Sequence, residues 1–77
     1  MNFTYILVSN VYYFASEMLT FYGIAAVKED GNRREIVDVA FDLSSDFEKV
    51  KRLSALCNEQ KLDAIHLHNV AEDFINA

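Results

Sequence analysis

Apolar and polar positions follow two different patterns along this 77-residue chain. Over residues 2–14, β-branched and aromatic residues dominate, which is typical of a strand, and residues 19–29 and 34–43 flank a hairpin turn signal. Beyond residue 45, apolar side chains recur every three or four positions, as they do along one side of a helix. The pattern therefore predicts three long strands over about 2–14, 19–29 and 34–43, followed by helices over about 46–58 and 63–76.

The clearest turn signal is Asp30-Gly31-Asn32-Arg33, because glycine and asparagine tolerate the positive φ of tight hairpins. Centring the turn on Gly31-Asn32 places Lys28 opposite Glu35 and predicts a core face made of Tyr22, Ile24, Val37, Val39 and Phe41. The connection before it, Ala15 to Met18, lacks a glycine. Ser9-Asn10 is turn-prone, and a turn there would add a fourth strand.

The opposite face of the hairpin contains both polar and apolar residues, and it is more apolar than expected for a face exposed to solvent. It is expected to carry Phe21, Gly23, Ala25, Val27, Arg34, Ile36, Asp38 and Ala40. The sequence does not say which face of the first strand joins the core.

Both helices show start signals. Ser45 followed by Glu48 resembles a capping box, and Asp63 is a candidate cap for the second helix. Each helix has one apolar stripe and would cover the core face of the sheet. We therefore expect an α+β fold in a single domain spanning residues 1–77: an antiparallel three-stranded meander covered on one face by two C-terminal helices.

Composition narrows the functional classes. The formal net charge of −5 argues against a protein that binds nucleic acid through its phosphates, although Lys28, Arg33 and Arg34 cluster at the hairpin tip. The aromatic residues of the strands lack the basic surround of an RNA-stacking sheet. A lone cysteine, Cys57, indicates a reducing compartment. The apolar N-terminal third is interrupted too often for a membrane span, so we expect a cytoplasmic protein that binds neither membrane nor nucleic acid.

Few residues suggest catalysis or metal binding. His66 and His68 point to different sides of a helix and cannot share a metal, and His68 is in position to pair with Glu72. Cys57 lies on an apolar helical stripe, where a buried thiol is the simpler interpretation. Asp38, Asp42 and Asp46 do not have the spacing of a calcium loop. We expect no catalytic residue, no cofactor and no metal site.

Several short motifs resemble a known family. They are Tyr22-Gly23-Ile24, Ile36-Val37-Asp38, His66-Leu67 and Glu72-Asp73-Phe74. Over about residues 20–75 the chain resembles a family of short, uncharacterised proteins from clostridia and related Firmicutes, known only as a domain of unknown function. The resemblance implies a cytoplasmic bacterial protein, and it brings no activity with it.

Three functions follow from these patterns. The one that we favour is a non-enzymatic interaction or regulatory module that forms a homodimer or binds a protein partner. Self-association would use the second sheet face or an edge strand, with Phe21, Val27, Ile36 and Ile65 as the expected interface residues. The alternatives are a small-molecule binder or enzyme whose site forms only at a dimer interface, and a nucleic-acid regulator that uses the basic hairpin tip.

Overall fold

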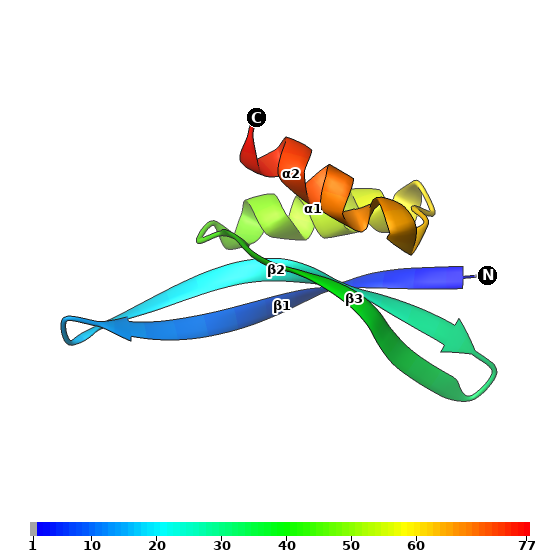
Figure 1. Cartoon of the computed structure of the whole chain (residues 1–77), viewed down its shortest axis with the longest axis horizontal. Helices are drawn as coiled ribbons and strands as arrows, with labels where there is room; N and C mark the ends of the chain where they lie inside the picture. Colours follow the sequence, from blue (N-terminus) through cyan, green and yellow to red (C-terminus); the bar gives the residue numbers. More distant parts are fainter. Residues whose placement is uncertain (1) are drawn as a thin grey trace.

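The computed structural model describes residues 2–77, with side chains from residue 3 onward. Three antiparallel strands, β1 (Asn2–Phe14), β2 (Glu17–Asp30) and β3 (Arg33–Ser44), form an open sheet in the order β1-β2-β3. Helix α1 (Phe47–Glu59), the short 3-10 helix η1 (Ala64–His66) and helix α2 (Leu67–Ile75) follow. The helices lie on one side of the sheet, as Figure 1 shows. This is the expected α+β arrangement of three strands and two C-terminal helices.

The β2–β3 hairpin has the turn that the sequence predicts, but the register changes along it. Asp30 pairs with Arg33 across Gly31-Asn32, and Lys28 pairs with Glu35 as expected. Val27 then pairs with Ile36, whereas Ala26 pairs with Asp38, so that Val37 is an extra residue in β3. An extra residue of this kind is a β-bulge, and it exchanges the two faces of the strand beyond it.

This bulge corrects part of the predicted core face. Tyr22 and Ile24 do contact the core, but Val37 and Phe41 are exposed, and Val39 pairs with Ala25 on the other face. Ala40, which was expected on the second face, is buried in the core instead. A second irregularity follows, because Ile24 pairs with Ala40 while Tyr22 pairs with Ser44.

The core lies between the sheet and the helices. Its most deeply buried side chains are Ile24, Val50 and Leu67, one each from β2, α1 and α2. On β1 the side chains that face the core are Phe3, Tyr5 and Leu7. The odd-numbered face of this strand therefore joins the core, which the sequence alone did not determine. Within residues 2–77, no helix is long and apolar enough to span a membrane.

Tyr5 joins β1 to the helical layer through its backbone as well as its ring. Its N–H donates to Asn58 Oδ1 (2.7 Å), and its carbonyl accepts from Ser54 Oγ (3.0 Å) and Asn58 Nδ2 (2.9 Å). Its hydroxyl donates to the carbonyl of Leu62 (2.5 Å). Helix α1 therefore occupies the outer edge of β1 at Tyr5.

The helix termini differ slightly from the expected ones. Asp46, not Ser45, is the N-cap of α1, and its carboxylate accepts from the N–H of Lys49 (3.2 Å). The Ser44 hydroxyl accepts from the N–H of Asp46, so the chain enters the helix one residue later than a Ser45 cap requires. Asp63 caps as expected, but it caps η1, and α2 begins at Leu67.

Candidate interaction surface

The β1–β2 hairpin extends beyond the helices as a two-stranded arm, which we define as residues 11–20 (Figure 1). Most of its apolar side chains are exposed on both faces, with Tyr13 80% and Phe14 73% exposed. The other exposed apolar residues of the arm are Val11, Tyr12, Met18 and Leu19. Glu17 is its only charged residue. An isolated two-stranded hairpin is marginally stable in water, and the arm is attached to the rest of the sheet only at its base.

The turn of the arm is tight although it has no glycine. Ala15 and Ser16 both have positive φ (50° and 68°) between the paired residues Phe14 and Glu17. Two successive positive φ values are typical of the two-residue hairpin turns that match the twist of the strands. The connection begins at Ala15 as expected, but it has two residues and not four, because β2 begins at Glu17.

The sheet face away from the helices, which we call the open face, continues from the arm. Along β2 it contains Phe21, Gly23, Ala25 and Val27. Its partners on the two neighbouring strands include Ile6, Ile36 and Val39. Ala25 and Val27 are themselves buried, whereas Ile36 is 57% exposed.

Gly23 lets β3 approach this face closely. A Cβ at Gly23 would lie 2.2 Å from the carbonyl oxygen of Ala40 and 3.1 Å from the Cα of Phe41. Asp42, two residues after Ala40 in β3, has a φ of 54°. Its carboxylate accepts hydrogen bonds from Asn10 Nδ2 (3.2 Å) and the Tyr12 hydroxyl. The close approach at Gly23 is thus accompanied by a contact between β3 and the base of the arm. The hydrogen bond from Tyr12 to the Asp42 carboxylate raises the pKa of the Tyr12 hydroxyl.

The four expected interface residues do not form one patch. Val27 and Ile36 are paired neighbours on the open face, but Val27 is buried. Phe21 is on the same face, partly buried, and its ring packs edge-to-face on Tyr12 with 5.9 Å between centroids. Ile65 is 77% exposed, but it belongs to η1 in the helical layer. The exposed arm residues were missed because their alternation is the same as that of the covered half of the sheet.

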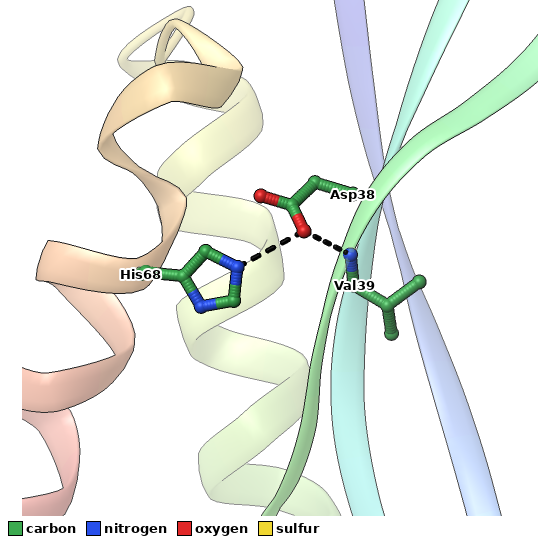
Figure 2. A network of polar contacts seen from close by, with 3 residues as sticks. All are labelled: Asp38, Val39 and His68. Carbon is green, nitrogen blue, oxygen red and sulfur yellow. Dashed lines mark hydrogen bonds and ion pairs between the residues drawn. The ribbon is translucent and has the colours of Figure 1, made fainter.

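The polar contacts differ from those expected. His68 does not pair with Glu72; its Nε2 lies 2.9 Å from Asp38 Oδ1, which also accepts from the N–H of Val39 (2.8 Å), as Figure 2 shows. These two contacts, chiefly the one with His68, lower the pKa of Asp38. The pair joins α2 to β3 just beyond the bulge at Val37. The bulge accounts for the difference, because it turns Asp38 toward the helical layer.

The candidate reactive groups are dispersed or buried. Cys57 is buried in the core, and burial raises the pKa of its thiol. Among residues 2–77, no three His, Cys, Asp or Glu side chains lie close enough together to hold a metal ion. At the hairpin tip, Arg34 pairs with Glu29 (3.3 Å between Nε and Oε1), which offsets one of the three clustered cations.

A groove of about 510 Å³ lies between β3 and α2. Its lining is mainly apolar, and His68 and Glu72 are its ionisable side chains. Neither is paired with a nucleophile. The mainly apolar lining can bind an apolar group, and the His68 that lines it is paired with Asp38.

Comparison with protein families identifies a relationship over the whole chain. The model of a family described as a family of unknown function, DUF6514, matches residues 1–77. The chain belongs to the DUF6514 family. Comparisons with curated proteins and with solved structures each found no match.

Membership of DUF6514 confirms the resemblance to a family of unknown function and extends it from residues 20–75 to the whole chain. In this DUF6514 chain three of the four motifs that carried the resemblance coincide with irregular parts of the fold, whereas Glu72-Asp73-Phe74 lies within α2. Gly23 is the point of close approach by β3, and Val37 is the extra residue of the bulge. His66-Leu67 is the junction between η1 and α2.

Proposed function

We propose that this protein is a small non-enzymatic interaction module that acts as a homodimer in the bacterial cytoplasm. The observation that carries the proposal is the arm, whose apolar side chains are exposed on both faces. Large contiguous apolar surfaces on small proteins usually mark contacts with other proteins. A 77-residue chain also gains from association, because a domain of this size buries a smaller share of its surface than a larger domain does.

The exposed area is of the right order for such a contact. The rings of Tyr12, Tyr13 and Phe14 together leave about 400 Å² exposed, taking ~200 Å² for a whole aromatic side chain. A stable interface buries roughly 800 Å² on each partner. These three residues would supply about half of it, and the remaining arm residues and Ile36 would add to it.

The cytoplasmic location is supported by the state of the single cysteine. Cys57 is a free, buried thiol, and its burial keeps it from forming an intermolecular disulfide. A small domain that relies on packing and association, with no disulfide, fits a reducing compartment.

Sedimentation equilibrium of the purified chain tests the proposal. The protein concentration is varied over roughly 1–300 μM, a range that distinguishes weak from strong association. We expect a dimer in the upper part of that range. Three matched substitutions locate the contact: Tyr13→Glu in the arm, Ile36→Glu on the open face and Ile65→Glu in the helical layer. Tyr13 and Ile65 are almost equally exposed, at 80% and 77%, so a difference between them reflects position and not exposure.

The proposal predicts that Tyr13→Glu dissociates the dimer and that Ile65→Glu does not. A monomer at every concentration would overturn the proposal. A dimer that is unaffected by both Tyr13→Glu and Ile36→Glu would also overturn it, because neither apolar surface would then form the contact.

A further inference from the structure

The two edges of the sheet differ in how well they are protected against pairing with another strand. On one side, β3 contains two irregularities, and α2 contacts it through His68 and Asp38. Bulges and covering helices are the usual means by which an edge strand avoids pairing. On the other side, β1 pairs with β2 in a single register along all 13 residues. It contains no charged residue and no proline.

The unpaired backbone groups of β1 follow from the hairpin geometry. Phe14 and Glu17 close a two-residue turn, so the N–H and C=O of Phe14 face β2. Alternate residues face alternate sides, and odd-numbered residues therefore direct these groups outward. Tyr5 confirms the phase, because its N–H and C=O bond to α1 and not to β2.

Helix α1 limits how much of this edge is free. Ser54 and Asn58 occupy the outward groups of Tyr5, so a second strand cannot pair there. Within the described part of the chain, the outward groups of Leu7, Ser9, Val11 and Tyr13 have no partner. The free stretch is therefore residues 7–13, and its midpoint is Asn10.

From this geometry we propose that β1 of one copy pairs antiparallel with β1 of a second copy, about a two-fold axis at Asn10. Of the symmetric registers, this one uses every free outward group and none of those blocked by α1. It pairs Leu7 with Tyr13 of the second copy and Ser9 with Val11. The result is a continuous six-stranded sheet with both helical layers on the same side. The proposal rests on the homodimer proposed above and specifies how that homodimer is built.

The side chains of β1 are complementary to themselves in this register. On the helix-covered side, Leu7 faces Tyr13 of the second copy. On the open side, Val8 faces Tyr12 and Ile6 faces Phe14. Pairs between aromatic and aliphatic side chains are among the favourable cross-strand pairs. No charged residue is opposed to another along the seam, because β1 has none.

The same register places the β1 edge of the arm against the second copy. Each arm runs alongside the first half of the other copy's β1, where α1 lies over the sheet. Tyr13 is then placed beside Leu7 of the second copy, next to that copy's helical layer. The assembly closes at two copies, because its remaining edges are the two bulged β3 strands.

Proline at Ser9 tests the edge pairing. The N–H of Ser9 points away from β2, so Ser9→Pro keeps the intramolecular sheet and removes one hydrogen bond of the seam in each copy. We expect Ser9→Pro to raise the dimer dissociation constant roughly 100-fold, since two hydrogen bonds are lost. Ser9→Ala, which keeps the N–H, should leave the constant within about threefold. Circular dichroism of both variants checks that the fold is retained.

Disulfide trapping tests the register even where Ser9→Pro fails to fold. Asn10 faces itself in a non-hydrogen-bonded pair, where Cα atoms are about 4.5 Å apart, within the range of a disulfide. We expect Asn10→Cys to form a covalent dimer under mild oxidation. Ser9→Cys should not, because its two copies would be about 8 Å apart. The wild-type chain with its buried Cys57 sets the background.

The outcomes separate this proposal from the one it rests on. A covalent dimer of Ser9→Cys or Val11→Cys, but not of Asn10→Cys, would overturn the register. A dimer that resists Ser9→Pro, does not cross-link through Asn10→Cys and dissociates with Ile36→Glu would overturn edge pairing and leave the homodimer standing on its open face. A chain that is monomeric throughout would overturn both.

Discussion

The two halves of the β1–β2 hairpin have similar sequences and opposite surroundings. In the first half, Tyr5 and Ile24 alternate with smaller residues and are buried under α1 and α2. In the arm, Tyr13 and Met18 pair with each other on the same face of the hairpin and are exposed. Alternation therefore specifies a strand with two faces, but it does not specify what covers them. The helices cover one half and leave the other half exposed.

Gly23 lies between these halves, and its substitution gives the largest expected effect. Gly23→Ala places a Cβ 2.2 Å from the carbonyl oxygen of Ala40, which is backbone and cannot rotate away. We expect the free energy of unfolding to fall by at least about 3 kcal/mol, measured by urea denaturation. Gly31→Ala is the control: its Cβ meets no atom within 4 Å, and its positive φ of 61° costs roughly 1–2 kcal/mol. Equal effects of the two substitutions would show that β3 does not pack on Gly23.

A matched pair of leucines measures the difference between the halves directly. Leu67→Ala removes a core side chain that is 1% exposed and should lower the free energy of unfolding by about 3 kcal/mol. Leu19→Ala in the arm should change it by less than about 0.5 kcal/mol at concentrations where the chain is monomeric. Urea denaturation at low and high protein concentration checks both. A large effect of Leu19→Ala in the monomer would mean that the arm is packed within its own chain.

The covered half of the hairpin and the arm are expected to differ in how their tyrosines affect stability at high pH. Burial raises the pKa of Tyr5 to about 12, with smaller contributions from Cys57 and Asp63. Because the unfolded pKa is about 10, the contribution of Tyr5 to stability is complete below pH 10 and is lost as the pH rises toward 12. Tyr5→Phe should lower stability at pH 7 by about 1 kcal/mol, through loss of the hydrogen bond to Leu62. It should also weaken the decline between pH 10 and 12.

The control for that measurement is Tyr13→Phe, which removes an exposed hydroxyl from the arm. It should leave both the stability of the monomer and its alkaline decline unchanged. Thermal denaturation from pH 7 to pH 12 makes the comparison. The assignment to Tyr5 would be wrong if the decline were as steep in Tyr5→Phe as in the wild-type chain.

The smallest expected effect is a stabilisation at the tip of the arm. Ser16 has a φ of 68°, a conformation that glycine adopts without the penalty of a Cβ. Ser16→Gly should raise the free energy of unfolding by about 0.5–1 kcal/mol. Ser9→Gly, in the extended part of β1, should lower it by a similar amount. Thermal melts measure both changes in the free energy of unfolding. Opposite signs for the two substitutions would establish a turn with positive φ at Ser16, and the same sign for both would exclude it.

The sequence predicted those parts of the fold that depend on near neighbours. The turn at Gly31-Asn32, the three strands, the two amphipathic helices and the cap at Asp63 all follow from residues a few positions apart. The extra residue at Val37 does not, because a bulge depends on how β3 lies against β2 and the helices. One added residue was enough to exchange the expected places of Phe41 and Ala40.

The candidate surface was predicted less completely for the same reason. Val27 and Ile36 were placed correctly on the open face, because the register next to the turn is determined by near neighbours. The exposure of Tyr13 and Phe14 was not predicted, because it depends on where the helices end over the sheet. The contact of His68 with Asp38, 30 residues away, likewise required the folded chain.

The attachment of Tyr5 has a consequence for the order of events during synthesis. Its hydrogen-bond partners Ser54, Asn58 and Leu62 are 49, 53 and 57 residues further along the chain. Strand β1 is therefore held in place at Tyr5 only after the chain as far as Leu62 has been synthesised. Contacts so distant in sequence slow folding, and until they form an uncharged strand stays available to neighbouring nascent chains.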